Sequence, residues 1–312
     1  MVEGQEDVSW EQWLALADAA ERSGLDALFR SDHYSSGFGI PGRACLDAWA
    51  TLAAIAARTE RIRLGTLVSP VTFRHPAVLA KAAATVDQIS GGRVEVGLGA
   101  GWNEGEHLAH GFPFPPLRER MTMLEEQVEI VHRLFTEDGV SFDGRHYRLE
   151  DCTSLPRPVQ QPRLPLIMGG HAGPRAAALA ARFADEYNAF LGAVPDIGAA
   201  RGRLAQACEQ ACRDPASLVF SVMTTVCVGS DRAEVLERAR LILRRLGDDG
   251  GDPEELLATR AEGWLTGTTD EAIVRLHELA EAGVERVYLQ HLAHEDVELV
   301  ELLGSEIAPA VS

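Results

Sequence analysis

Short apolar segments with β propensity alternate with amphipathic helical segments along most of the chain, and this alternation is the strongest constraint on its fold. Seven segments are predicted to be strands: 25–30, 61–68, 93–98, 166–168, 187–191, 218–228 and 284–290. Segments with helical periodicity separate them, and crossovers of that kind join parallel neighbours. The sequence therefore predicts an α/β protein built on a parallel sheet.

The pattern favours a closed (β/α)8 barrel over an open doubly wound sheet. In the open sheet, the turn after the first strand carries Gly-x-Gly-x-x-Gly, and no such turn occurs near the N-terminus. Residues 1–4 are the candidate for the eighth strand of a barrel, but they are too short to cross its wall. We therefore expect one TIM-like barrel domain over residues 1–312, with a first strand that is shortened or missing. A hairpin insertion is expected at about 137–162 and an acidic insertion at about 247–264.

Composition excludes several classes of partner. A net charge of −18 without a clustered basic segment argues against nucleic acid. The sequence has no apolar run long enough to span a membrane and no signal peptide, so we expect a cytoplasmic protein without membrane contact. The five cysteines form no Cys-x-x-Cys pair and are expected to be reduced thiols. Lys81 is the only lysine, so arginines, backbone N–H groups and helix N-termini would have to hold an anion.

Asp32 and His33 follow directly on the predicted strand 25–30. A histidine beside a carboxylate at the C-terminal end of a barrel strand can exchange a proton with a ligand or hydrogen-bond to it. The structural alternative is a turn that Asp32 caps and His33 completes. Both interpretations stay open at this point.

Two glycine-rich segments also follow predicted strands. Gly99 and Gly101, in the run Gly-Leu-Gly-Ala-Gly at 97–101, could let the backbone approach a planar ligand, although a plain tight turn is the alternative. Residues 169–175 read Gly-Gly-His-Ala-Gly-Pro-Arg and lead into a helix. Free N–H groups, the helix dipole and a nearby guanidinium favour an anion there, with a glycine-lined connection as the alternative.

Metal and acyl-transfer chemistry have little support. Histidines and carboxylates occur together at 104–110 and 291–295, but neither segment contains His-Glu-x-x-His. We expect no metal site. The sequence also lacks a Gly-x-Ser-x-Gly nucleophile motif.

Seven ordered segments resemble the bacterial luciferase-like superfamily: 31–34, 64–68, 73–77, 91–93, 97–102, 155–160 and 169–170. Among them are Ser-Asp-His-Tyr at 31–34 and Gly-Leu-Gly-Ala-Gly-Trp at 97–102. Within the superfamily, the chain is most similar to oxidoreductases that depend on coenzyme F420, a 5-deazaflavin. The resemblance extends from about Trp10 to about Gln290.

The resemblance implies a TIM-like barrel that holds the deazaflavin at its C-terminal mouth. It assigns Asp32 to cofactor binding and His33 to the substrate side of the ring, as a catalytic residue. It implies a bulge at Leu67 and Val68, often with a non-prolyl cis peptide, against the back of the ring. The cofactor phosphate would lie at the loop that contains Gly169, Gly170, Gly173, Pro174 and Arg175.

One departure from the family concerns the proton donor. Members that oxidise sugar phosphates or alcohols carry a glutamate general acid directly after the glycine run, whereas this chain has Trp102 there. Glu104, two residues further along, is the candidate for this catalytic role. The loops 35–44, 102–116 and 247–264 are expected to form the wall of the substrate pocket.

The resemblance leads us to expect hydride transfer between F420 and a small organic substrate, in a homodimer. FMN is the alternative cofactor, because FMN-dependent monooxygenases of the alkanesulfonate type share the signature. A protein that binds flavin without turnover is a second alternative, and a metal-dependent barrel hydrolase ranks last. Four arginines are candidates for binding the polyglutamate tail of F420: Arg30, Arg43, Arg74 and Arg175.

Overall fold

A parallel sheet forms the centre of the protein in the computed structural model, which describes residues 1–193 and 196–311. Its strands lie in the order β1 (Ala27–Arg30), β2 (Arg63–Pro70), β3 (Val94–Gly99), β6 (Leu166–Gly169), β7 (Glu186–Phe190), β8 (Val219–Gly229) and β10 (Arg286–Gln290). Each neighbouring pair in this order is parallel. All seven strands predicted from the sequence are therefore confirmed. The short strand β9 (Leu265–Thr268), which was not predicted, pairs with the end of β8.

Val2 bridges the two edges of this sheet, β1 and β10. Its N–H donates to the carbonyl of Phe29 over 2.9 Å, and its own carbonyl accepts from the N–H of Ser31 over 3.1 Å. On the other side, the N–H of His291 donates to the carbonyl of Met1 over 2.9 Å. An isolated bridge on each side of Val2 thus stands where a barrel has its first strand. The prediction of a TIM-like barrel fold is confirmed, with single-residue bridges at Val2 in place of a full first strand between β1 and β10.

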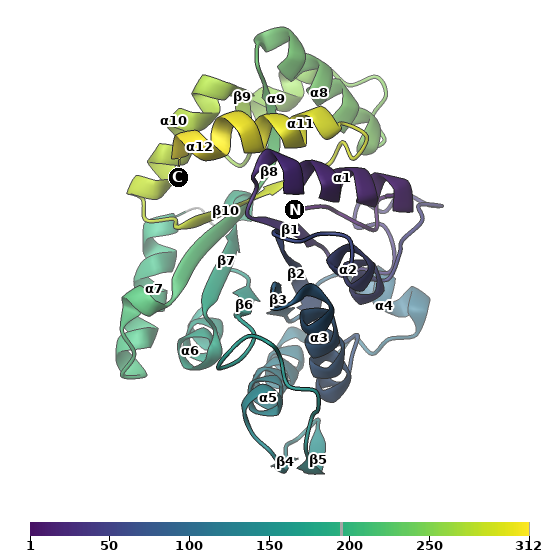
Figure 1. Ribbon diagram of the computed structural model, residues 1–312. Coiled ribbons are helices and arrows are strands. Elements are labelled where there is room, and N and C mark those ends of the chain that lie inside the picture. Colours follow the sequence, from purple (N-terminus) through teal and green to yellow (C-terminus); the bar gives the residue numbers. More distant parts are fainter. Residues whose placement is uncertain (194–195, 312) are drawn as a thin grey trace.

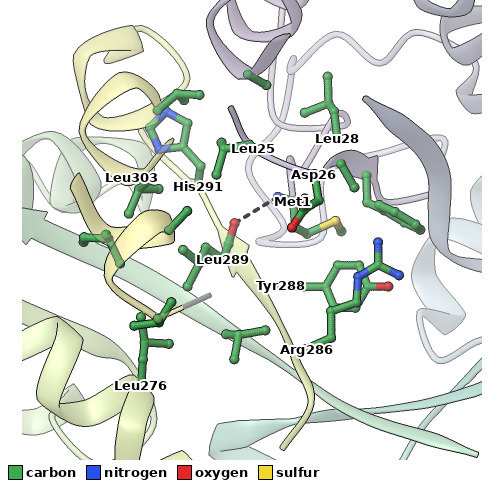
Figure 2. A pocket seen from close by; sticks show the side chains of 18 of the residues that line it. Met1, Leu25, Asp26, Leu28, Leu276, Arg286, Tyr288, Leu289, His291 and Leu303 are labelled. Carbon is green, nitrogen blue, oxygen red and sulfur yellow. Dashed lines mark hydrogen bonds between the residues drawn. The ribbon is translucent and has the colours of Figure 1, made fainter. Parts of the chain in front are cut away.

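A cavity of 370 Å³ opens in the wall beside this short closure, between β1 and β10 (Figure 2). Phe29 and Tyr288 line it from the strands, and Leu16, Leu276 and Leu303 line it from the surrounding helices. The amino group of Met1 lies at the cavity and donates to the carbonyl of Leu289 over 2.9 Å. The candidate site residues do not line this cavity.

Helices surround the ring (Figure 1). They are α1 (Trp10–Ser23), α2 (Ala48–Ala56), α3 (Pro76–Ser90), α5 (Leu117–Thr136), α6 (Pro174–Phe183), α7 (Ile197–Gln210), α8 (Arg232–Arg245), α10 (Thr269–Glu281) and α11 (Val297–Leu302). After α11, a π-helical turn (Leu303–Ile307) leads into α12 (Ala308–Val311), and short 3₁₀ turns occur at Leu191–Ala193 and Pro215–Ser217. No helix in the described part of the chain combines the length and apolarity that crossing a bilayer requires.

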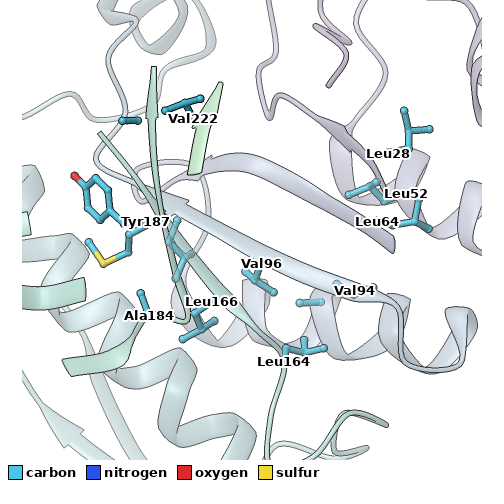
Figure 3. Close-up of a cluster of buried hydrophobic side chains, with 14 of the residues drawn as sticks. Leu28, Leu52, Leu64, Val94, Val96, Leu164, Leu166, Ala184, Tyr187 and Val222 are labelled. Carbon is cyan, nitrogen blue, oxygen red and sulfur yellow. The ribbon is translucent and has the colours of Figure 1, made fainter. Parts of the chain in front are cut away.

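The main apolar core lies between the sheet and these helices (Figure 3). β3 illustrates how the sequence builds it, because successive side chains of a strand point to opposite faces. Val94, Val96 and Leu98 are fully buried members of this core. The intervening residues Glu95, Gly97 and Gly99 face the inside of the barrel, where glycines leave space at the mouth.

The two segments expected to be insertions have secondary structure of their own. In the first, β4 (Val140–Asp143) and β5 (Arg148–Cys152) form an antiparallel hairpin that extends beyond α5 (Figure 1). The acidic insertion contains a helix, α9 (Pro253–Arg260), that the sequence analysis did not predict. Its buried Leu256 and Leu257 pack against α8 in a second, smaller apolar cluster. A further short helix, α4 (Glu104–His110), follows β3 at the mouth of the barrel.

Candidate functional site

The candidate residues lie at the C-terminal ends of β1, β2, β3 and β6. Because these strands are parallel neighbours, their C-terminal ends form one rim of the barrel. His33 follows β1, the bulge at Leu67 and Val68 lies in β2, and the loop 169–175 follows β6. The structure therefore brings three of the predicted segments to the same end of the barrel.

His33 is held by Glu106. Its Nδ1 atom lies 2.7 Å from Oε2 of Glu106, whose side chain is completely buried, whereas that of His33 is 11% exposed. The other carboxylate oxygen accepts the backbone N–H groups of Tyr34 and Ser35. Glu106 thus fixes both the imidazole ring and the backbone that follows it.

The pair shifts the pKa values of both groups. Burial disfavours the imidazolium, but the hydrogen bond and charge of Glu106 outweigh it, so the pKa of His33 is raised. Burial alone would raise the pKa of Glu106. The contact with His33 and the two backbone N–H groups outweigh this effect and lower the pKa of Glu106. The site therefore holds an ionised Glu106 beside a His33 imidazole that protonates readily.

Sequence reasoning selected Glu104 and missed Glu106. Asn103 caps α4 by accepting the N–H of Glu106 over 3.2 Å, so Glu104 begins the helix and is exposed. Glu106 is then the third helical residue and faces inward. The spacing Asn-x-x-Glu is a signal of a helix N-terminus and would have identified Glu106 as the constrained carboxylate. Its partner His33 could not be found from that signal.

Asp32 does not cap a local turn. Its Oδ2 atom accepts from the hydroxyl of Ser69 over 2.6 Å and from the guanidinium of Arg74 over 2.5 Å, so it joins β1 to the end of β2. The Oδ1 atom is buried and has no hydrogen-bond partner in the described structure. Asp32 therefore offers a free acceptor beside His33.

The bulge of β2 rests on glycines. The peptide between Leu67 and Val68 is cis, and the register with β3 shifts at this position, so the predicted bulge and cis peptide are present. A Cβ atom on Gly99 would lie 2.5 Å from Cγ2 of Val68, and one on Gly169 would lie 3.1 Å from Cγ1. Glycines on β3 and β6 thus leave the space that the side chain of Val68 occupies.

This contact corrects the interpretation of the glycine run. Gly97 and Gly99 belong to β3 and receive Val68, so neither forms a tight turn. Gly101 is the residue with a left-handed conformation, at a φ of 76°, and it directs the chain toward Trp102. A planar ligand would therefore meet the partly exposed Val68.

The loop 169–175 leaves backbone donors free. Gly170 donates to the carbonyl of Asn188 over 3.0 Å, and Ala172 donates to the hydroxyl of Tyr187 over 2.8 Å. Gly173 caps α6 without a side-chain acceptor, and the first helical bond runs from Ala177 to Gly173. The N–H groups of the first turn consequently face outward without an acceptor in the described chain, which suits an anion.

The resemblance placed Arg175 at the cofactor phosphate, and the structure shows that its guanidinium has partners within the chain. Its guanidinium forms an ion pair with Glu125 and donates to the hydroxyl of Thr122 over 2.8 Å. Both partners lie on α5. The side chain therefore joins α6 to α5 and already has a counter-ion.

Aromatic side chains stand beside His33. The ring of Trp102 lies 5.6 Å from that of His33, edge to face, and Trp102 is 63% exposed. Phe38 is also exposed, and the adjacent Gly37 would place a Cβ 3.8 Å from the Trp102 ring. This part of the rim combines one imidazole with an apolar wall.

The described residues contain no group of three or more histidines, cysteines or carboxylates that could hold a metal ion. His107, one of the histidines noted in the sequence, pairs its Nε2 atom with the hydroxyl of Thr72 at 2.6 Å. Cys45 donates its thiol to the carbonyl of His33, and burial raises the pKa of Cys45 to about 11. It is therefore a protonated thiol and a poor nucleophile at neutral pH.

A family model described as luciferase-like monooxygenase matches residues 2–286. Among curated relatives, an F420-dependent glucose-6-phosphate dehydrogenase of Nakamurella multipartita is 30% identical over 317 residues, which cover 94% of this chain and 90% of that protein. A protein of the same name from Kineococcus radiotolerans is 33% identical over 224 residues, which cover 71% of this chain and 65% of that protein.

Solved structures share the fold. Monooxygenase RslO1 from Streptomyces bottropensis superposes with a TM-score of 0.84 at 25% identity, covering 99% of this chain and 97% of that one. An F420-dependent secondary alcohol dehydrogenase, solved with an F420–acetone adduct, gives a TM-score of 0.80 at 23% identity, covering 98% and 96%. Because the identity to the alcohol dehydrogenase is below 25%, this similarity shows a shared fold alone.

Proposed function

The chain belongs to the luciferase-like monooxygenase family, and from this membership and the geometry of the rim we propose that it is an F420-dependent oxidoreductase. It transfers a hydride between the deazaflavin and a small organic substrate. The observation that carries the proposal is the buried His33–Glu106 pair, which holds an imidazole at the mouth of the barrel. Dependence on F420 is further supported by the names of the curated relatives.

The residues at the rim fit a deazaflavin. Val68, which packs against Gly99 and Gly169, gives an apolar support for a flat ring. Oδ1 of Asp32 can accept a hydrogen bond from a ring N–H. The free N–H groups at Gly173 and the start of α6 suit the phosphate. The bound cofactor supplies a ring carbon that exchanges hydride, and the protein supplies position and proton transfer.

His33 moves the proton. The carboxylate of Glu106 can only accept a hydrogen bond, so Nδ1 of His33 carries a hydrogen and Nε2 is left for the substrate. In alcohol oxidation, the neutral Nε2 takes the hydroxyl proton while the carbon loses its hydride. In the reverse reaction, the imidazolium donates a proton to the carbonyl oxygen. Glu106 stabilises the imidazolium that forms or is consumed.

The surroundings of His33 favour an uncharged alcohol or carbonyl compound. The exposed ring of Trp102 gives an apolar surface beside His33, and Arg43 and Arg74 are each paired with a buried carboxylate. The latter two guanidinium groups therefore carry no free charge for a substrate phosphate.

Titration of the purified protein with F420 and with FMN, followed by fluorescence, tests the cofactor. We expect tighter binding of F420, followed by loss of deazaflavin absorbance when a secondary alcohol is added to the loaded enzyme. Tighter binding of FMN together with oxygen consumption would instead make the protein an FMN monooxygenase. Binding of F420 without turnover on any alcohol or carbonyl compound would leave a binding protein.

A further inference from the structure

We propose that Trp102 selects substrates whose reacting carbon carries a flat aromatic group, such as aryl ketones and the matching secondary alcohols. The inference rests on the proposed function, because it narrows the uncharged alcohols and carbonyl compounds to those with an aromatic substituent. Trp102 is then a specificity-determining residue that binds the substituent, while His33 transfers the proton.

The side chain of Trp102 is open to solvent directly beside His33. The centroids of the two rings are 5.6 Å apart, and their planes meet at 72°. Trp102 is 63% exposed, so most of the indole surface is uncovered. Its N–H donates to no acceptor within residues 1–193 and 196–311. An uncovered indole next to the proton-transferring imidazole is an apolar surface that a substrate on His33 would contact.

The backbone on both sides of Trp102 is fixed. Gly101 has a left-handed φ of 76°, and Asn103 caps α4. The carbonyl of Asn103 lies 2.6 Å from Nδ1 of His107, and Nε2 of the same imidazole lies 2.6 Å from the hydroxyl of Thr72. The indole therefore stands on a rigid segment, and less conformational entropy is lost when a ligand packs against it.

The distance between the two rings sets where the aromatic group must be attached. A carbonyl oxygen that accepts from Nε2 of His33 lies about 2.9 Å from this nitrogen. Aromatic rings in contact have centroids about 4.5–7 Å apart. A ring bonded directly to the carbonyl carbon can therefore contact Trp102 while the oxygen stays on His33.

The loop after β1 borders the indole on its other side. A Cβ atom on Gly37 would lie 3.8 Å from Cζ2 of Trp102 and 3.4 Å from Nε2 of Gln5. The backbone at Gly37 thus lies beside the indole, which stands between this loop and His33. A flat group makes more contact in a space bounded in this way than a thicker saturated group does.

Residue 102 is free for binding because other residues handle the proton. The buried Glu106 holds His33, and this pair supplies the acid and the base of the proposed reaction. An indole N–H is a donor only and does not exchange its proton in the physiological pH range. The contribution of Trp102 is therefore to substrate affinity, and we expect it in KM more than in kcat.

The test compares acetophenone with cyclohexyl methyl ketone, which has a ring of similar size that is saturated. Each ketone takes a hydride from reduced F420 at the carbonyl carbon and a proton from His33 at the oxygen, and loss of reduced F420 is followed by absorbance. The ratio of kcat/KM for acetophenone over the saturated ketone should fall about tenfold in Trp102→Ala, mainly through KM. Trp102→Phe should keep most of the ratio.

Val274→Ala is the control, because it shortens a side chain of similar exposure, 59%, on α10. It should leave the ratio unchanged. An unchanged ratio in Trp102→Ala would overturn the inference while the proposed function stands. A weaker Kd for F420 in Trp102→Ala, with the ratio unchanged, would assign the indole to the coenzyme and also overturn it. If reduced F420 binds but is oxidised by no ketone or other carbonyl compound, the proposed function falls and the inference with it.

Discussion

Glu106 lies 73 residues after His33 in the chain, and their side chains meet at 2.7 Å in the mouth of the barrel. The contact links the loop after β1 to the short helix after β3. It gives the imidazole a fixed ring orientation, one committed nitrogen and a raised pKa. The predictions below begin with this pair and then follow the elements that surround it.

Glu106→Gln should shift the pH dependence of turnover. The amide keeps a hydrogen-bonding group beside Nδ1 but removes the charge that raises the pKa of His33, so this pKa falls. The acid limb of alcohol oxidation, where neutral His33 is required, should move to lower pH, and kcat should fall about 10- to 100-fold. Glu104→Gln is the control, because Glu104 is exposed on the same helix. If Glu104→Gln shifts the profile and Glu106→Gln does not, the catalytic carboxylate is the one named from the sequence.

Gly99→Ala should weaken binding of the coenzyme through Val68. The added Cβ would lie 2.5 Å from Cγ2 of Val68, so the bulge must move. Overpacking of this kind costs about 1–3 kcal/mol, which corresponds to a rise in Kd of about tenfold or more. The double variant Gly99→Ala/Val68→Ala should recover much of the affinity. Gly105→Ala, whose nearest neighbour would be the side-chain oxygen of Asn103 at 3.6 Å, is the control. Equal coenzyme affinities in all three variants would show that the packing of Val68 against Gly99 does not affect coenzyme binding.

Acid should destabilise the fold through buried basic groups. Burial lowers the pKa of His291 from the ordinary 6.5 of a histidine to about 4. The unfolded chain therefore binds more protons between pH 6.5 and 4, and the free energy of unfolding decreases as the pH falls through this range. Burial also lowers the pKa of the Met1 amino group from 8.0 to about 5, which extends the same trend upward.

His291→Leu should reduce this acid sensitivity. The leucine cannot titrate, so up to about 3 kcal/mol of the loss between pH 6.5 and 4 should disappear. Urea unfolding at pH 8, 6.5 and 4.5 measures the difference. His277→Leu, on the exposed face of α10, is the control and should leave the slope unchanged. Parallel curves for His291→Leu and the unchanged protein would show that the pKa of His291 is the same in the folded and unfolded states.

A strand attached to the amino group of Met1 should stabilise the barrel. The 370 Å³ cavity lies between β1 and β10, and Leu16, Leu276 and Leu303 offer an apolar surface there. A five-residue extension with alternating Val and Thr should lie in this space and raise the melting temperature by a few degrees, since it buries apolar side chains. A Gly-Ser extension of the same length is the control. Equal melting temperatures for the two extensions would show that the cavity accepts no strand.

Much of the fold follows from local pattern. Apolar periodicity located every strand of the sheet. The helix after β3 was missed because it is only seven residues long, about two turns, and mostly polar (104–110). The strand β9 was missed for a related reason: its four residues pair with an extension of β8, which no local signal reveals. The homodimer and the single-domain organisation stay predictions, as do the roles of the site residues.

The sequence by itself determined the parallel barrel and the rim that carries Asp32, His33 and the loop 169–175. Periodicity and crossover length are local properties, and parallel strands necessarily end on one side. The tertiary structure alone decided that Glu106 holds His33 and that Val68 packs against Gly99 and Gly169. It also decided that Arg175 is paired with Glu125, whereas the side chains of Arg118 and Arg145 have no ion-pair partner in the described chain. These are contacts between segments far apart in the chain, and the side-chain directions that make them depend on how helices and loops pack around the barrel.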